Sequence, residues 1–248
     1  LSHRFSRRIL FGVPDMRISV ALFVAALIGV FGFAIHGALQ AERTEAPSGL
    51  AGARTIIDAA KFPTLQAALD AVPAEGGVVE LPPGTFEITE PLKVLRGDTL
   101  IRGSGAATHI INKNEAGESA LVVRHPAFPE KKDGNSRNWR VQIADLRITG
   151  NEKSGHGIEA NYVLEIFIHG VTVSNNGKHG IYLDFCYEDP RVSDCLITYN
   201  KQTGLEIIGC HDIVVCGNQF EENLDAVRCI DAYNLCMTGN NVDDHLRH

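Results

Sequence analysis

The stretch NNGKHGIYLD, residues 175–184, combines asparagine, a polar turn and Gly-Ile-x-Leu, and fragments of it return elsewhere in the chain. Related hexapeptides, HGIEAN, HGIYLD, TGLEII and DAVRCI, begin at His156, His179, Thr203 and Asp225, with spacings of 23, 24 and 22 residues. A second register agrees, because an apolar residue stands three positions before an asparagine in each unit. These asparagines are Asn151, Asn176, Asn200 and Asn223. Two phased registers of similar period predict a repeat architecture.

The repeat unit holds only short stretches of alternating apolar character, bounded by Gly, Asn, Asp or Pro, and none has the 3.6-residue period of a helix. Leucine-rich repeats have a similar period, but their fixed leucine and asparagine pattern is missing. The pattern therefore predicts a solenoid of short parallel strands, in which matching side chains of coils about 4.8 Å apart form columns. The predicted interior column is Ile158, Ile181, Leu205 and Val227. The repeated asparagines are expected to form an internal ladder at a turn.

A short helix is predicted upstream of the repeats. Thr64 follows Pro63 as an N-cap candidate, and apolar residues recur at helical spacing from Leu65 to Val72. Such an amphipathic helix would cover the open end of the first coil, which otherwise exposes unpaired strand edges and apolar core.

Two further segments, AALDAVPAEGGVVELPPGTFEI at 67–88 and TLIRGSGAATHI at 99–110, precede the GIYL-type repeats. Together they resemble the right-handed parallel β-helix proteins related to pectate lyases, over about residues 55–248. The resemblance implies an all-β fold, a right-handed parallel β-helix with an N-terminal capping α-helix. It is specific for the fold and weak for the activity, because this fold serves lyases, hydrolases, epimerases and non-catalytic proteins. Members usually act on or bind acidic polysaccharides outside the cytoplasm.

The chain is expected to contain three parts. Residues 1–41 contain Arg17, then an apolar run and small residues, which is typical of a signal peptide or an N-terminal membrane anchor. Met16 is a candidate start of translation, in which case residues 1–15 would not belong to the protein. Residues 42–54 have the composition of a linker, and residues 55–248 form the β-helix domain. Because NNVDDHLRH begins another coil after Asn240, we expect the domain to be truncated at its C-terminus. Export predicts a secreted, periplasmic or cell-surface location.

Composition restricts the partners. The net charge is −7, and no basic stripe is present to displace counterions from phosphates, which argues against nucleic acid. A polysaccharide is the expected partner. Membrane association is expected only through an uncleaved N-terminal segment, and the protein is expected to be a monomer.

The repeat alignment also predicts an outward-facing ridge, formed by Glu159, Tyr182, Glu206 and Arg228 in one column. Asp184 belongs to the next outward column, and two histidines stand before the repeat glycines. The predicted substrate-binding residues are Glu159, His179, Tyr182, Asp184, Glu206 and Arg228. The predicted catalytic residues are His156, Glu206 and Arg228. Solvated strand residues with no ligand would give the same pattern, so this alternative stays open.

A lyase needs a base next to a uronate carboxyl group and a cation to stabilise the resulting enolate. Calcium, a cation with oxygen ligands, is the usual device, and Asp184, Glu188 and Asp189 are its candidate ligands. Gly155-His156-Gly157 is similar to the Gly-His-Gly of polygalacturonases, but the paired aspartates of that family do not precede it. Lyase-like cleavage is therefore favoured over glycoside hydrolysis. The alternative is a non-catalytic carbohydrate-binding or structural surface protein.

The six cysteines all lie in the last third of the chain. Cys186 and Cys210 each come six residues after a repeat glycine, so they are expected to stack on neighbouring coils. Buried apolar packing is the favoured role. A disulfide between these two stays open, since export would permit it.

Overall fold

The computed structural model describes residue 50, residues 52–129 and residues 136–246. The predicted signal or anchor segment, residues 1–41, and most of the predicted linker lie outside the described residues. From Arg54 onward the chain forms one compact unit. None of the helices in the described part has the length and apolar character needed to span a membrane.

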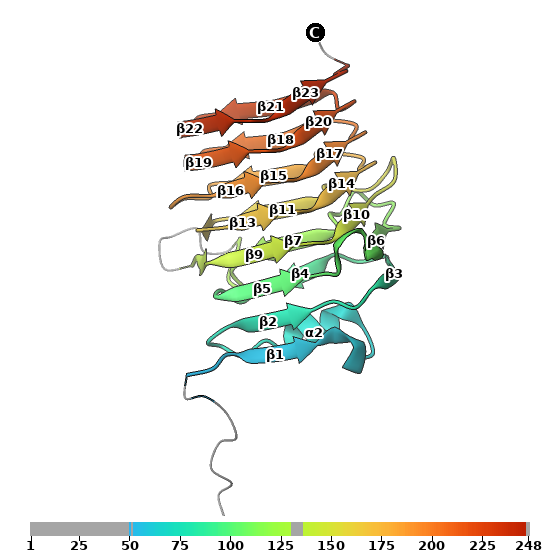
Figure 1. The fold of residues 1–248 in the computed structure, drawn as a ribbon, viewed down its shortest axis with the longest axis vertical. Coiled ribbons are helices and arrows are strands. Elements are labelled where there is room, and N and C mark those ends of the chain that lie inside the picture. The colour runs from blue at the N-terminus through green and yellow to red at the C-terminus, as the bar shows by residue number, and fades with distance from the viewer. Residues whose placement is uncertain (1–49, 51, 130–135, 247–248) are drawn as a thin grey trace, which may run out of the picture. The chain divides into compact units, whose positions relative to one another are not determined.

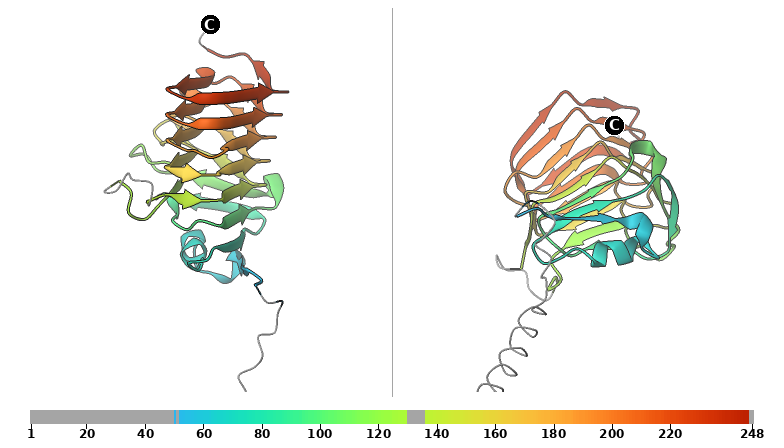
Figure 2. Two further views of the ribbon diagram at one scale, coloured as in Figure 1. Left: turned by 90° about the vertical axis from the view of Figure 1, so that its left-hand side faces the viewer. Right: turned by 60° about the horizontal axis from the view of Figure 1, so that its bottom comes forward.

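Three parallel β-sheets form the walls of a coil, and the strands of each sheet stack along its axis (Figures 1 and 2). Sheet A, with eight strands, contains β1 (Thr55–Asp58), β2 (Gly77–Glu80), β5 (Thr99–Arg102), β9 (Val141–Ala144), β13 (Phe167–His169), β16 (Arg191–Ser193), β19 (His211–Cys216) and β22 (Tyr233–Thr238). Sheet B, with seven, contains β3 (Gly84–Ile88), β6 (Thr108–Asn112), β10 (Arg147–Thr149), β14 (Thr172–Ser174), β17 (Leu196–Thr198), β20 (Gln219–Glu221) and β23 (Asn241–Asp243).

Sheet C, with six strands, contains β4 (Leu92–Val94), β7 (Leu121–Arg124), β11 (Ile158–Asn161), β15 (Ile181–Asp184), β18 (Thr203–Ile208) and β21 (Asp225–Ile230). A small fourth sheet pairs β8 (Asn138–Trp139) with β12 (Val163–Leu164). The helical elements among the described residues are η1 (Ala59–Lys61), α2 (Leu65–Asp70) and η2 (Gly105–Ala107). The chain therefore visits sheets A, B and C in turn, as a parallel β-helix requires.

The predicted interior column is confirmed. Ile158 pairs with Ile181, Ile181 with Leu205, and Leu205 with Val227 in the registers of sheet C. The first three of these side chains are fully buried. Because strand side chains alternate between faces, fixing this column inside fixes the intervening column outside.

The asparagine ladder forms over three coils. Nδ2 of Asn176 donates to Oδ1 of Asn200 at 2.8 Å, and Nδ2 of Asn200 donates to Oδ1 of Asn223 at 2.8 Å. The backbone N–H groups of Asn176 and Asn200 donate to the same two oxygens. Asn151 stays outside this ladder, because its Oδ1 accepts the N–H of Lys153 and closes a local turn. The ladder satisfies backbone groups that the bend leaves without strand partners.

The predicted capping helix is confirmed as α2. The Oγ1 atom of Thr64 accepts the N–H of Ala67 at 3.1 Å, which makes Thr64 the N-cap. The helix packs against β4, the first strand of sheet C. It lies at the N-terminal end of the coil, near β1 and β2 (Figure 1). The amide of Gln66 accepts the N–H of Lys93 at 2.7 Å and donates to the same residue's carbonyl at 3.2 Å. A side chain thus takes the place of a neighbouring strand at this edge.

The cysteines are free thiols in the structure. Cys186 and Cys210 are fully buried on neighbouring coils, as expected from their spacing, and the N–H of Cys186 lies 3.2 Å from Sγ of Cys210. Burial raises the pKa of Cys186 well above its ordinary value, so this thiol stays protonated. These observations agree with a packing role for Cys186 and Cys210, whereas Cys229 and Cys236 are exposed.

Candidate functional site

The outward column of sheet C has the predicted register. Glu159 pairs with Tyr182, Tyr182 with Glu206, and Glu206 with Arg228 on β11, β15, β18 and β21. His156 and His179 immediately precede this column, and their rings stack with that of Tyr182. We call this set the ridge: His156, Glu159, His179, Tyr182, Glu206 and Arg228. Sequence reasoning therefore found residues that the fold brings together, while their roles stay predictions.

Glu206 is fully buried although its side chain belongs to an outward column. Nε of Arg228 donates to both Glu206 oxygens at 2.8 Å, and Nη2 of Arg228 lies 2.7 Å from Oε1. The hydrogen bond that Arg228 donates to Glu206 raises the pKa of Arg228, so the guanidinium remains charged. Arg228 is itself 46% exposed, and it presents the positive charge of this pair to solvent. The Glu206 carboxylate is thus bound by Arg228 within the protein, and the Arg228 guanidinium faces solvent.

The two histidines are held in one tautomer by the backbone. Nδ1 of His156 accepts the N–H of His179 at 3.2 Å, and Nδ1 of His179 accepts the N–H of Thr203 at 3.1 Å. Both rings are therefore neutral and carry their proton on Nε2. Although Nδ1 of His179 lies 3.8 Å from Glu206, it has no proton with which to form an ion pair.

Burial agrees with these tautomers. Desolvation, followed by the neighbouring His179, lowers the pKa of His156 to about 3. Burial also lowers the pKa of His179, an effect opposed by Glu206. The His156 ring lies 5.1 Å from the His179 ring and 4.7 Å from the Tyr182 ring, with nearly parallel planes. Since the rings cover parts of one another's faces, their edges carry the polar atoms available to a ligand.

Tyr182 lies in a region of negative potential. Burial first, and then Asp184, Glu159 and Glu206, raise the pKa of its phenol to about 12. The phenol is therefore protonated at physiological pH and can donate a hydrogen bond. Glu159 accepts a hydrogen bond from Oγ of Ser119 at 2.6 Å, which fixes the carboxylate at the start of the ridge.

The predicted calcium ligands occupy the corner where sheet C turns toward sheet A. Asp184 ends β15, whereas Glu188 and Asp189 follow the corner and are exposed. Among the described residues, no group of three or more His, Cys, Asp or Glu side chains is arranged to hold a metal ion. Calcium binding by these three residues stays a prediction, and it would need further oxygen ligands from a substrate or from water.

Sequence reasoning missed a cluster of rings and guanidinium groups at the same corner, which we call the aromatic edge. It consists of Arg124, Phe128, Arg137, Tyr162, Phe185, Tyr187 and His211. The rings of Tyr162 and Phe185 stack at 5.2 Å, and those of Tyr187 and His211 stack at 4.1 Å. Extending the repeat alignment by one residue would have aligned Tyr162 with Phe185. Phe128 and Arg137 come from the excursion between β7 and β9, which has no repeat register.

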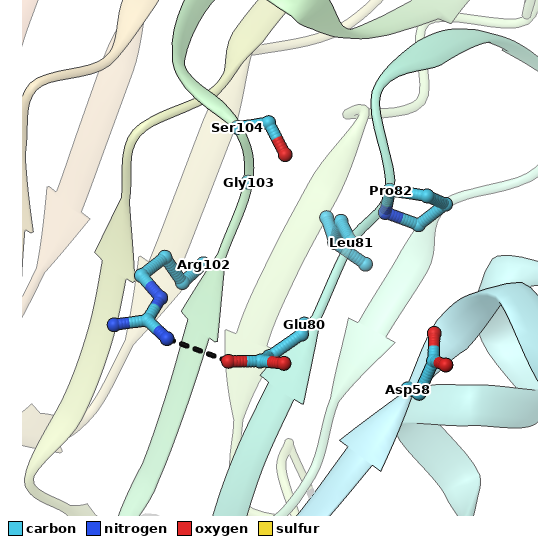
Figure 3. Close-up of a pocket in the computed structure, with 7 residues that line it drawn as sticks. All are labelled: Asp58, Glu80, Leu81, Pro82, Arg102, Gly103 and Ser104. Atoms are coloured by element: carbon cyan, nitrogen blue, oxygen red, sulfur yellow. Dashed lines mark hydrogen bonds and ion pairs between the residues drawn. The ribbon is translucent and has the colours of Figure 1, made fainter.

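A separate hollow lies on the first coils of sheet A and shares no residue with the ridge (Figure 3). Its volume is about 360 Å³. Asp58, Glu80 and Arg102 come from β1, β2 and β5, and Arg102 lies 2.6 Å from Glu80. Both partners of this ion pair are about half exposed, so it contributes little to stability.

The comparisons with known proteins address the fold. Residues 133–246 match the family model described as right handed beta helix region. No curated protein matches the chain. A solved structure of ORF18 from Geobacillus virus E2 is similar, with a TM-score of 0.62 and 16% identity over 76% of this chain and 40% of that chain.

Two enzyme structures are also similar. The A-module of the mannuronan C-5 epimerase AlgE6 from Azotobacter vinelandii has a TM-score of 0.47 and 20% identity, over 74% of this chain and 56% of that chain. DFA-IIIase from Arthrobacter chlorophenolicus A6 has a TM-score of 0.49 and 13% identity, over 75% of this chain and 61% of that chain. The chain thus spans 40 to 61% of the length of these three proteins, and at such identities the likeness concerns the fold alone. The match over residues 133–246 and the three parallel sheets show that the chain folds as a right-handed parallel β-helix.

Proposed function

We propose that the outer face of sheet C binds an acidic polysaccharide whose chain runs from coil to coil along the ridge. The observation that carries this proposal is the convergence of His156, His179, Tyr182 and Arg228 on one outer face, each with its orientation fixed by the protein. A polar surface held in place before binding loses little conformational entropy when a ligand arrives.

The available groups suit a sugar. Nε2–H of each histidine and the phenol of Tyr182 are hydrogen-bond donors, and Glu159 is an acceptor for sugar hydroxyls. Arg228 supplies a planar charged donor for a carboxylate. Stacked rings expose edges of positive electrostatic character, which also favours anionic groups.

The negative potential around Tyr182 restricts how an acidic sugar binds. Its carboxylates are repelled from the centre of the ridge, where Glu159, Asp184 and Glu206 raise the pKa of the phenol. They are expected to contact Arg228 instead, or to share a calcium ion with Asp184 and its neighbours. Calcium-dependent binding is therefore part of the proposal.

Lyase-type cleavage is the second candidate activity. It is favoured by Arg228, whose charge would neutralise a uronate carboxylate, and by Tyr182, whose protonated phenol would donate a hydrogen bond to the leaving oxygen. Both Glu206 oxygens contact Arg228, and Nδ1 of His156 accepts a backbone N–H. The Glu206 carboxylate and Nδ1 of His156 already accept hydrogen bonds within the protein, so neither is free to act as a base. Binding is therefore the primary proposal.

Affinity electrophoresis with polygalacturonate, alginate and a neutral glycan, each with calcium or with a chelator, tests the proposal. Tyr182→Ala is expected to weaken binding about tenfold, since it removes a hydrogen bond and a ring contact. Tyr199→Ala is the matched control, because Tyr199 is 50% exposed and lies outside the ridge, after a strand of sheet B. Equal effects of the two variants, or no binding by the unaltered protein, would refute the proposal.

The same incubations separate the activities. Products with ultraviolet absorbance indicate elimination, and new reducing ends without absorbance indicate hydrolysis. Export remains part of the proposal, because an extracellular polysaccharide requires an extracellular protein. Fractionation of the full chain, with sequencing of its mature N-terminus, tests whether residues 1–41 are removed as a signal or retained as an anchor.

A further inference from the structure

We propose that Arg124 and Arg137 form a carboxylate-binding subsite at the aromatic edge, where sheet C turns toward sheet A. This inference rests on the proposed function and specifies how the ligand is recognised. It assigns the acidic groups of the glycan to two guanidinium groups outside the ridge. The hydroxyl groups of the glycan then fall on the part of the ridge between this subsite and Arg228.

The geometry of Arg137 is built by rings on two coils. Its guanidinium carbon lies 5.0 Å from the centre of the Tyr162 ring and 4.3 Å from that of Tyr187. Its Nη1 donates to the backbone oxygen of Phe185 at 3.0 Å. A guanidinium held between aromatic rings keeps its planar donor fork in one orientation, which suits two parallel hydrogen bonds to a carboxylate.

Arg124 extends the subsite by one further ring. Its guanidinium carbon lies 5.6 Å from the centre of the Phe128 ring, which in turn lies 5.6 Å from the Tyr162 ring. Arg124 and Arg137 are both half-buried, so a charge–charge contact is screened less here than on an open surface. Asp184, which contributes to the raised pKa of Tyr162, is the opposing carboxylate. Glu188 and Asp189 lie at the same corner but are exposed, so the two half-buried guanidinium groups are the charges held against the rings of the aromatic edge.

A second observation points to an unmet polar requirement in the same place. Asn161 lies between Arg124 and Asp184 in the register of sheet C. It is only 3% exposed, and its Oδ1 atom has no hydrogen-bond partner. Buried acceptors without partners are uncommon in folded proteins and call for a hydrogen-bond donor, such as water or a hydroxyl group. The unpaired oxygen of Asn161, next to Arg124 in the strand register, therefore suits a hydroxyl of the sugar whose carboxylate binds the arginines.

The spacing of the charges specifies the ligand further. Arg124 on β7 and Arg228 on β21 are four coils apart, which corresponds to about 19 Å along the axis. Between them lie the carboxylates of Glu159 and Glu206, the neighbours of Tyr182 in the strand register. A glycan that contacts both ends must therefore be an oligomer with carboxylates on separated sugars. Oligomers too short to span this distance are expected to bind more weakly than long ones.

Arg124→Met tests the subsite, because methionine keeps the apolar contact with Phe128 and removes the charge. The variant is expected to bind polygalacturonate about tenfold more weakly, the effect of losing one charge-assisted hydrogen bond. Binding of fully methyl-esterified polygalacturonate is expected to be unchanged, since it lacks the carboxylates. Arg137→Lys is expected to give a smaller loss, because it keeps the charge without the planar fork.

Arg191→Met on sheet A is the matched control, since Arg191 is an exposed strand arginine on another wall. Equal losses on the free and esterified polymers, no loss with Arg124→Met, or tighter binding of dextran sulfate than of polygalacturonate would overturn the carboxylate assignment. If Tyr182→Ala abolishes binding while Arg124→Met leaves it unchanged, this subsite fails and the proposed function stands. If the unaltered protein binds none of these polymers, both fail.

Discussion

Replacing His156 with glutamine is expected to make the stability of the fold less sensitive to acid. The folded protein keeps this ring neutral down to about pH 3, because burial lowers its pKa from 6.5. The unfolded chain takes up a proton at His156 as the pH falls through 6.5. Between pH 6.5 and pH 3 the unfolded state therefore binds more protons, so stability falls as the pH decreases. At neutral pH the contribution is fully present.

The magnitude follows from the two pKa values. Integrating the difference in bound protons from pH 7 to pH 5 gives a loss of about 2 kcal/mol from His156 alone. Urea unfolding followed by circular dichroism at both pH values measures the loss. His156→Gln is expected to lose about 2 kcal/mol less than the unaltered protein over this range. Glutamine can still accept the N–H of His179, so the coil retains a hydrogen-bond partner there.

Tyr182→Phe provides the matched control. The substitution preserves the ring stack, and the phenol, with a pKa of about 12, stays protonated between pH 5 and pH 7. Its pH dependence is therefore expected to equal that of the unaltered protein. If His156→Gln and Tyr182→Phe lose the same stability between pH 7 and pH 5, the burial of His156 in the neutral form is refuted.

Three further substitutions test the coil. Arg228→Met is expected to destabilise the fold by about 2–3 kcal/mol in urea unfolding, because it leaves the buried Glu206 carboxylate without its partner. Adding Glu206→Leu should restore most of this stability, and additive losses in the double variant would contradict the coupling. Asn200→Ala removes the oxygen that accepts the backbone N–H and the side-chain amide of Asn176. The variant is expected to lose about 2–4 kcal/mol of stability by the same assay. A loss below about 0.5 kcal/mol would mean that the ladder does not stabilise the fold. Gly209→Ala is expected to lower the stability of the fold by at least about 1 kcal/mol more than Gly105→Ala. Both glycines have φ near +60°, but of the two only Gly209 would bring an added Cβ within 2.9 Å of an aromatic ring. Equal decreases in melting temperature for the two variants would exclude this clash.

The interior of the coil was predictable from the sequence because the fold repeats one requirement in every turn. A side chain at the position of Ile158, Ile181 or Leu205 has nowhere to point except into the core, so the apolar period appears directly in the sequence. The N-cap at Thr64 was predictable for a similar reason, since capping is decided by residues within one turn. Structural features that depend on neighbouring residues, or that recur in every coil, can therefore be predicted from the sequence.

The candidate site was predictable only in part. Strand alternation gives the direction of the Glu206 side chain, but its burial depends on Arg228 one coil later, which folds back over it. Arg137 reaches the aromatic edge from an excursion that obeys no register. Asp184 and Glu188 are close in sequence, yet Phe185 between them adopts a left-handed conformation at a corner of the coil. Nearness along the chain therefore does not make them joint ligands of one ion.

The column that contains Ser119, His156, His179 and Thr203 shows how the structure restricts the chemistry of this face. The N–H of His156 donates to Ser119, that of His179 to His156, and that of Thr203 to His179. Each side chain thus accepts from the backbone of the next coil, whereas the asparagine oxygens at their own turn accept from the backbone of the preceding coil. His156 can accept a substrate proton on Nδ1 only by giving up the bond that holds the next coil. A lyase on this face would need its base from another residue, and His156 is therefore better suited to donate a hydrogen bond from Nε2 to a bound sugar.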